Sequence, residues 1–235
     1  AAVLLKPLQE ENKKLDRMKN VLIAAGLFNE DSKKSDINSL FEQIDSKVVE
    51  LASGEYIEDI DPDKFDQRKA AKDPKRSSKL TTAQDIAKIK QRSNQRIVYF
   101  KRDGDKIERI ILPVYGKGLW STMYGFIALD ADLKTVKSFG FYEHGETPGL
   151  GGEVDNKNWK AGWVDKLAFD EQGRPTIQVI KGTVQDTDPE APYKVDGIGG
   201  ATITCRGVAN LVQFWLGQEG YGPLLERLKT GDDNG

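Results

Sequence analysis

Residues 97–100, Ile-Val-Tyr-Phe, open the stretch of sequence that decides the fold. It continues through Asp103-Gly104 to residues 107–114, Ile-Glu-Arg-Ile-Ile-Leu-Pro-Val. β-Branched and aromatic residues favour extended backbone, and an Asp-Gly pair favours the tight turn between two antiparallel strands. This combination predicts a β-hairpin over residues 97–114 and is the strongest short-range strand signal in the chain.

Apolar runs after the hairpin predict further strands. Residues 124–129 and 136–144 flank a polar turn at residues 130–132, and residues 176–181 follow Gly173. Because turn residues separate these runs at short intervals, we expect neighbouring strands to pair in antiparallel fashion.

Apolar residues at three- and four-residue spacing predict helices towards both ends of the chain. The predicted helices cover residues 8–25, 37–51, 85–90, a short segment within 154–163, and residues 204–216. Gly26 and Gly217 are expected to end the first and the last, and Thr81 or Thr82 to cap the third. Strands clustered between terminal helices predict an α+β fold with a central, mainly antiparallel sheet and flanking helices.

Composition divides the chain into three segments. Residues 1–54 hold the first two predicted helices, residues 55–95 form a charged linker or extension, and residues 96–235 form the main domain. The middle segment begins with an acidic cluster and continues with lysine and arginine residues between positions 64 and 79, which is typical of a solvated surface.

Composition also narrows the function. The chain has 235 residues, 38% of them hydrophobic, enough for one substantial core, and its net charge of −2 disfavours nucleic acid as a partner. It has one cysteine, Cys205, and one histidine, His144, so we expect neither an intramolecular disulfide nor a metal site. A buried helix position is expected for Cys205, and a structural or solvated role for His144.

Residues 196–204, Asp-Gly-Ile-Gly-Gly-Ala-Thr-Ile-Thr, place two threonine hydroxyls directly before the last predicted helix. Unpaired N–H groups and the positive end of the helix dipole favour a phosphate there, by roughly 0.3–1 kcal/mol for an exposed group. Thr202 is therefore a candidate attachment site for an anionic cofactor. In the alternative interpretation, Thr202 or Thr204 only caps the helix and the glycines only form a turn.

Two other glycine-rich blocks could approach a planar ligand. In residues 146–152, Glu-Thr-Pro-Gly-Leu-Gly-Gly, proline fixes φ and the glycines let the backbone come close. The alternative is a surface turn after a strand. Residues 116–125 lack the spacing of a nucleotide triphosphate loop. Within this block, Trp120 and Tyr124 could stack on a ring or belong to a core or interface.

Residues 196–204 and 146–152 resemble two signature sequences of the FMN-binding domains of respiratory sodium pumps and related electron-transfer complexes, and residues 116–125 resemble a third. The resemblance implies that a flavin transferase moves FMN from FAD onto Thr202 through a phosphoester bond. A threonine hydroxyl needs activation, and no activating residue lies nearby in sequence, which agrees with activation by a separate enzyme.

The resemblance also assigns residues to the cofactor. It implies that the flavin ring and phosphate contact Glu146, Thr147, Gly149, Leu150, Gly200, Ala201 and Thr204. In this assignment residues 146–150 border the ring, Gly200 and Ala201 leave the Thr202 hydroxyl accessible, and Thr204 steadies the phosphate. An electron carrier needs no catalytic acid–base pair, so no catalytic residue is expected.

The N-terminal part extends the resemblance. Residues 6–27 are similar to the juxtamembrane helix of the NqrC family, the C-type subunits of sodium-translocating NADH:quinone oxidoreductases. The resemblance implies an electron relay with covalent FMN in a bacterial inner-membrane complex that couples NADH oxidation and quinone reduction to sodium export. Its partners would be the other subunits and a flavin transferase, with the flavin domain on the extracytoplasmic (periplasmic) side.

No stretch approaches the roughly 20 apolar residues that cross a bilayer. Residues 1–5 are abruptly apolar, so we expect a single membrane helix, typical of the family, to precede them; an intact mature N-terminus is the alternative. Two other functions stay open. One is an FMN-binding domain of another respiratory complex, such as the G-type subunits of ferredoxin-linked complexes. The other is a non-enzymatic interaction domain to which no flavin attaches.

Overall fold

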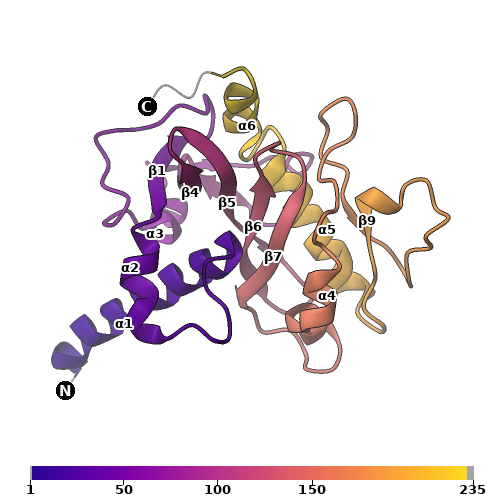
Figure 1. Cartoon of the computed structure of the whole chain (residues 1–235), viewed down its shortest axis with the longest axis horizontal. Coiled ribbons are helices and arrows are strands. Elements are labelled where there is room, and N and C mark those ends of the chain that lie inside the picture. The colour runs from indigo at the N-terminus through magenta and orange to yellow at the C-terminus, as the bar shows by residue number, and fades with distance from the viewer. Residues whose placement is uncertain (1, 232–235) are drawn as a thin grey trace.

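Five strands form one antiparallel sheet at the centre of the computed structural model, in the spatial order β1-β4-β5-β6-β7 (Figure 1). The structure describes the backbone of residues 2–231 and the side chains of residues 11–231. The strands are β1 (Ile44–Glu50), β4 (Gln95–Asp103), β5 (Lys106–Lys117), β6 (Thr122–Asp130) and β7 (Val136–Glu143). The prediction of a central, mainly antiparallel sheet is confirmed.

The predicted hairpin forms the middle of this sheet as β4 and β5. Tyr99 pairs with Ile111, Asp103 pairs with Lys106, and Gly104 between the strands has a φ of 58°. The turn residues are Gly104 and Asp105, one position after the predicted Asp103-Gly104 pair, and glycine adopts the positive φ of this turn at little cost.

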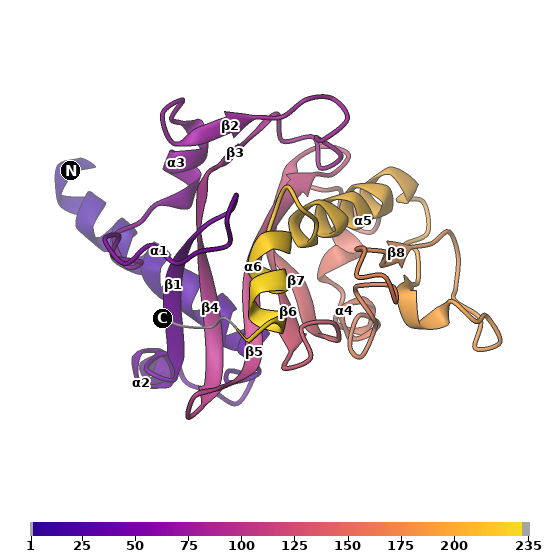
Figure 2. The same ribbon diagram turned by 90° about the horizontal axis from the view of Figure 1, so that it is seen from above.

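Both faces of the sheet are covered. Ile97 and Tyr99 belong to the core on the side of α1 (Ala2–Ala25), whereas Val98 and Phe100 belong to the core on the other side. That second core includes α5 (Thr202–Leu216) and α6 (Gly222–Lys229), and Figure 2 shows the sheet between α1 and these two helices. Successive side chains of a strand point to opposite faces, so the unbroken apolar run at residues 97–100 reflects burial on both.

The first and last predicted helices are confirmed as α1 and α5. Helix α5 begins at Thr202, two residues before the predicted start, and ends before Gly217. Leu8, the first apolar position predicted for the N-terminal helix, lies in α1, but its side chain is outside the described residues. The residue spacing did not predict helix α6. Its Leu224, Leu225 and Leu228 pack into the same hydrophobic core as α5.

The predicted helix over residues 37–51 is wrong. The segment contains the short helix α2 (Ile37–Phe41) and then the edge strand β1, whose Val48 pairs with Ile97 of β4. Ile44 and Val48 are four residues apart, an even number that puts two side chains on one face in a strand as well as in a helix. The spacing therefore fits both structures, and pairing with β4 decided between them.

The predicted helix over residues 85–90 is also wrong. This segment consists of turns, and Lys88 and Lys90 have φ values of 55° and 67°, which a right-handed helix excludes. The Asp85 carboxylate accepts hydrogen bonds from the N–H groups of Ile89 at 2.7 Å and Lys90 at 2.8 Å. Local hydrogen bonds from an aspartate thus replace those that a helix would make.

The remaining elements are short. They are η1 (Lys34–Asp36), α3 (Gln67–Lys72), β2 (Ser77–Lys79), β3 (Gln91–Ser93), η2 (Gly151–Asp155), α4 (Lys157–Ala161), β8 (Gln178–Val179), η3 (Ala191–Tyr193) and β9 (Lys194–Val195). Helix α4 confirms the short helix predicted within residues 154–163, and β8 lies inside the strand predicted at 176–181. Because β1 joins β4 in one sheet, residues 1–54 contribute to the main sheet; the three-segment division stays a prediction.

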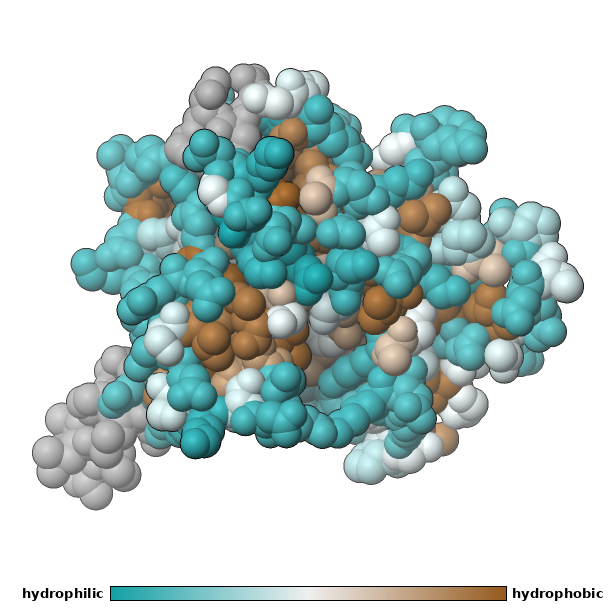
Figure 3. Space-filling view, viewed as in Figure 1, coloured by the Kyte–Doolittle hydropathy of each residue, from teal (hydrophilic) through white to brown (hydrophobic). Residues whose placement is uncertain are grey.

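The surface is mainly hydrophilic on the face drawn in Figure 3, with hydrophobic side chains gathered near α1. Within residues 2–231, no helix is both long enough and apolar enough to cross a bilayer.

Candidate functional site

The three glycine-rich blocks meet at the N-terminal end of α5, where the Glu146 carboxylate joins them. Its Oε1 accepts hydrogen bonds from the N–H groups of Trp120 and Ser121, both at 3.0 Å. Its Oε2 accepts from the Leu119 N–H at 3.1 Å and from the Thr204 hydroxyl at 2.7 Å. One carboxylate therefore connects the loop before β6, the loop after β7 and the first turn of α5.

This junction is buried. Glu146 is 5% exposed and Thr204 is 1% exposed. Burial alone would raise the pKa of the Glu146 carboxyl, but the hydrogen bonds from Thr204, Ser121, Trp120 and Leu119 together lower the pKa below its ordinary value. The carboxylate is thus held ionised, as the shared acceptor of these donors.

Glycines allow the three segments to approach this closely. A Cβ atom at Gly118 would lie 2.6 Å from Glu146 Oε1, and one at Gly151 would lie 2.6 Å from Thr204 Oγ1. A Cβ atom at Gly207 would lie 2.4 Å from the carbonyl oxygen of Lys117. These distances are too short for a side chain, so close packing of the three segments requires glycine at these positions.

Thr202, by contrast, is exposed and is the first residue of α5. The N-cap position is Ala201, and no side chain caps the helix. Neither Thr202 nor Thr204 is therefore the cap that the alternative interpretation expected. The first N–H groups of a helix have no partner within the helix, so this helix end offers donors and a positive dipole end beside an accessible hydroxyl.

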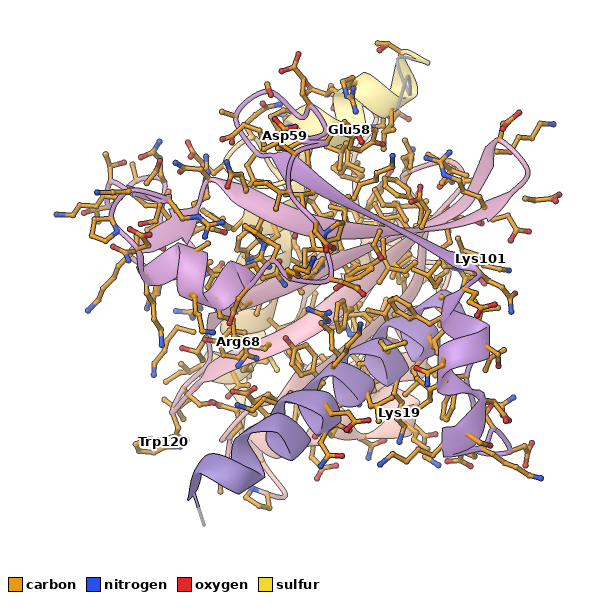
Figure 4. All side chains as sticks on the ribbon, turned by 90° about the vertical axis from the view of Figure 1, so that its left-hand side faces the viewer. Lys19, Glu58, Asp59, Arg68, Lys101 and Trp120 are labelled. Atoms are coloured by element: carbon orange, nitrogen blue, oxygen red, sulfur yellow. The ribbon has the colours of Figure 1, made fainter. Side chains whose placement is uncertain are left out.

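Exposed apolar side chains occur on each of the three joined segments. Leu119 is 40% exposed, Trp120 67%, Leu150 45% and Ile203 56%. Figure 4 shows Trp120 pointing away from the ribbon. Gly200 has a φ of 74°, and a Cβ atom there would lie 2.8 Å from Leu150 Cδ2, so Leu150 lies directly against the segment that precedes Thr202. Apolar surface beside a helix N-terminus that offers N–H donors suits a ligand that has both a phosphate and a planar ring.

The other predicted positions of the loop after β7 form its turn. The carbonyl oxygen of Thr147 accepts hydrogen bonds from Leu150 at 3.1 Å and Gly152 at 2.9 Å, and Gly149 has a φ of 73°. Thr147, Gly149 and Leu150 are exposed, whereas Glu146 is buried. The structure thus brings the predicted residues to one place but separates an exposed group from three buried residues, Glu146, Ala201 and Thr204.

His144 supports this loop. Its Nδ1 accepts the Glu146 N–H at 3.2 Å and its Nε2 lies 2.7 Å from Asp155 Oδ2. This assigns the proton of a neutral ring to Nε2, so that it donates to Asp155. Burial alone would raise the pKa of Asp155, but hydrogen bonds from His144 and Lys160 lower it. Both groups have structural partners, in agreement with the structural role expected for the histidine.

Two supporting residues were missed at the sequence level. The Ser121 hydroxyl accepts the Gly145 N–H at 2.8 Å and donates to Glu146 Oε1 at 3.2 Å. The Asp196 carboxylate accepts the Val184 N–H at 2.8 Å, which ties the threonine-bearing segment to a distant loop. Ser121 and Asp196 both lie inside the glycine-rich blocks. The sequence therefore indicated the segments of the site, but it could not predict which residues form hydrogen bonds with one another.

Cys205 has a structural position. It is 3% exposed, its sulfur accepts the Ile198 N–H at 3.3 Å, and burial raises the pKa of its thiol. The buried helix position predicted for this cysteine is confirmed.

The chain is similar to known proteins over almost its whole length. The FMN-binding domain family matches residues 118–217. The C subunit of Na(+)-translocating NADH-quinone reductase from Pseudomonas aeruginosa is 49% identical over 99% of this chain and 89% of its own length. The same subunit from Yersinia pestis is 45% identical over 98% of this chain and 86% of its own length. The crystal structure of NqrC from Shewanella oneidensis superposes with a TM-score of 0.85 at 36% identity, covering 93% of this chain and 99% of that one.

Proposed function

The chain belongs to the NqrC family, the C-type subunits of Na(+)-translocating NADH-quinone reductases, and we propose that it carries FMN on Thr202 as an electron relay of such a complex. The relay would operate within a membrane complex that couples NADH oxidation and quinone reduction to sodium export. Membership of this family sets aside the G-type subunits of ferredoxin-linked complexes as an alternative.

The observation that carries the proposal is the exposed Thr202 hydroxyl at the uncapped N-terminal end of α5. A phosphate attached there would receive hydrogen bonds from the free N–H groups of the first helical turn and be stabilised by the helix dipole. The apolar side chains of Leu150 and Trp120 are exposed on adjoining segments. They suit a flat ring, which would bury part of this surface.

The remaining predicted residues divide into two roles in this proposal. Thr147, Gly149, Leu150 and Gly200 are exposed and form the surface that the cofactor contacts, whereas Ala201, 4% exposed, is the buried N-cap residue of α5. Glu146 and Thr204 lie beneath this surface. Their carboxylate and hydroxyl are buried and form a hydrogen bond of 2.7 Å. Their effect is to hold the loops that bear the contact residues at a fixed position relative to Thr202.

In this proposal the chain itself performs no acid–base step. Among the described residues, none accepts a hydrogen bond from the Thr202 hydroxyl. A separate flavin transferase would supply the activation, and the exposed Gly200, which has no side chain, leaves room for it. When bound, FMN supplies the redox chemistry, exchanging electrons with neighbouring carriers, while the protein contributes attachment, orientation and electrostatics.

Membership of the family also supports the proposed location and partners. The other subunits of the complex would be its partners, and a single-pass helix would hold it in the bacterial inner membrane with the flavin domain on the periplasmic side. Co-purification with those subunits from a membrane extract tests this part separately from flavin attachment.

Intact mass and in-gel flavin fluorescence after denaturation test the attachment. The chain would be co-produced with a flavin transferase as wild type, Thr202→Ala and Thr204→Val. We expect an FMN adduct on the wild type, its complete loss in Thr202→Ala, and its retention, with lower occupancy, in Thr204→Val. An adduct that persists in Thr202→Ala would refute the anchor. No adduct on the wild type, with an active transferase confirmed on another substrate, would favour the non-enzymatic interaction domain.

A further inference from the structure

A cavity lies between α3, the segment at residues 88–91 and the adjoining ends of the central strands. Its volume is about 770 Å³, within the range of small-molecule sites. It shares no lining residue with the loop at 146–152 or with residues 196–204, whereas Lys117, Thr122 and Tyr124 of its lining belong to the block at residues 116–125. Arg68, labelled beside α3 in Figure 4, is one of its lining residues.

The lining of this cavity is strongly cationic. Six lining side chains are positively charged, and they are Arg68, Lys72, Lys88, Lys90, Arg96 and Lys117. The lining contains one carboxylate, Glu143, and it is already paired with Arg68 at 2.7 Å. Among the described side chains, none of the four lysines forms an ion pair. The cavity therefore holds an excess of positive charge that the protein does not neutralise.

A buried cation lies among these residues. Arg96 is 2% exposed and donates hydrogen bonds to the Pro113 carbonyl oxygen at 3.1 Å and the Tyr221 hydroxyl at 3.3 Å. Its guanidinium also lies 4.6 Å from the Trp215 ring centroid. Within the described residues no carboxylate pairs with it. A buried charge without a counterion is costly, and an anion in the cavity would lower that cost.

Tyr115 adds an unused polar group. It lines the cavity and is 8% exposed; its hydroxyl is shielded from solvent and has no hydrogen-bond partner among the described residues. Burial raises the pKa of this hydroxyl, so it keeps its proton and can donate. Buried hydroxyls are nearly always hydrogen-bonded, and the exceptions call for a specific explanation, such as a ligand.

Two of the lining lysines, Lys88 and Lys90, have an uncommon backbone conformation. Lys88 and Lys90 have φ values of 55° and 67°, in the left-handed region that lysine seldom adopts. The Asp85 carboxylate holds the segment by accepting from the amides of Ile89 and Lys90. Backbone strain of this kind concentrates at ligand clamps, where the surrounding structure maintains it.

We propose that this cavity binds a phosphate group, carried by a small organic phosphate or by a phospholipid headgroup. A phosphate brings up to two charges and three acceptor oxygens, which suits a lining with four lysines from several elements. A carboxylate brings one charge and favours the planar fork of an arginine, and here the exposed arginine, Arg68, is already engaged with Glu143. The inference does not depend on the flavin proposal.

The test is calorimetric titration of the full chain with inorganic pyrophosphate, with citrate as a carboxylate of similar charge. Tyr115→Phe removes only the unpartnered hydroxyl, and Lys88→Gly with Lys90→Gly removes two charges at positions whose φ suits glycine, so neither should impair folding. Lys106→Gln, at the β4–β5 turn, is the control for loss of charge elsewhere.

We expect pyrophosphate to bind the wild type more tightly than citrate does. We expect the double glycine variant to weaken binding about tenfold or more, because two charge-assisted contacts are lost, and Tyr115→Phe to weaken it severalfold. Lys106→Gln should leave binding unchanged. Equal weakening by Lys106→Gln would mean unspecific attraction of anions and overturn the proposal, as would tighter binding of citrate.

Sedimentation with vesicles separates the two sources of the phosphate. Binding to phosphatidylglycerol vesicles but not to phosphatidylcholine vesicles, reversed by pyrophosphate and lost in the double glycine variant, would identify a headgroup. Pyrophosphate binding without vesicle binding would identify a soluble phosphate. If the wild type binds neither pyrophosphate nor phosphatidylglycerol vesicles, the cavity is not a phosphate site.

Discussion

The α1 face of the central sheet and the junction at the N-terminal end of α5 are held by different kinds of contact. On one face, Val21 and Leu22 of α1 are fully buried in a core with Ile97 and Ile111. At the N-terminal end of α5 on the other face, the junction depends on hydrogen bonds to one buried carboxylate, Glu146. Apolar burial supplies most of the stability but little directionality. Hydrogen bonds add less free energy but determine which loops lie beside Thr202.

The largest expected change in stability comes from the apolar core on the α1 face of the sheet. Leu22→Ala removes a fully buried side chain, and we expect the free energy of unfolding to fall by about 3 kcal/mol because a cavity remains. Ile23→Ala, its 44% exposed neighbour, is the control and should cost much less. Chemical denaturation measures both. Flavin occupancy at Thr202 should stay normal at a temperature where Leu22→Ala is folded; its loss there would mean that the two faces are coupled.

At the polar junction around Glu146, we expect a smaller change in stability than for Leu22→Ala but a larger change in FMN occupancy. Glu146→Ala leaves the Thr204 hydroxyl and the amides of residues 119–121 without their acceptor, which should cost about 2 kcal/mol. Because the loops lose their common acceptor, FMN occupancy by intact mass should also fall. Glu171→Ala, an exposed carboxylate, should change neither. Normal occupancy in Glu146→Ala would show that the junction does not position the attachment site.

The polar junction should also show a pH dependence that the apolar face lacks. The pKa of Glu146 is lowered on folding, so its contribution to stability is present above its unfolded pKa and is lost as pH falls through the folded value. Between about pH 5 and pH 3, wild type should therefore lose more stability than Glu146→Gln. Denaturation curves of both proteins across this range measure the difference. Parallel curves would show that the carboxylate is not preferentially stabilised in its ionised form.

The smallest stability change is expected at the exposed side chains around Thr202. Trp120→Ala should alter the free energy of unfolding by no more than about 0.5 kcal/mol, since the ring is 67% exposed. If the flavin ring contacts Trp120, the fluorescence of folded, flavin-loaded protein should rise in this variant, because an adjacent indole quenches flavin emission. Leu119→Ala is the control for loss of apolar surface alone. Unchanged fluorescence in Trp120→Ala would place the ring away from this side chain.

The sequence alone determined the features that depend on short-range chemistry. Residues 97–114 contain their own strands and turn, so the β4–β5 hairpin followed directly from composition and the Asp-Gly pair. The start of α5 at Thr202 was predicted within two residues because the apolar spacing and Gly217 are local signals. The glycine-rich blocks were likewise visible, although their packing against one another was not.

Only the tertiary structure decided matters that depend on partners distant in the chain. The pairing of β1 with β4 turned residues 44–50 into a strand. The same holds for Glu146, which is 58 residues from Thr204 in sequence and 2.7 Å from it in space. Local spacing cannot specify which distant groups meet, because a long-range contact depends on the arrangement of every element between them. That arrangement leaves Thr202 exposed and buries Thr204, two residues away in the same motif.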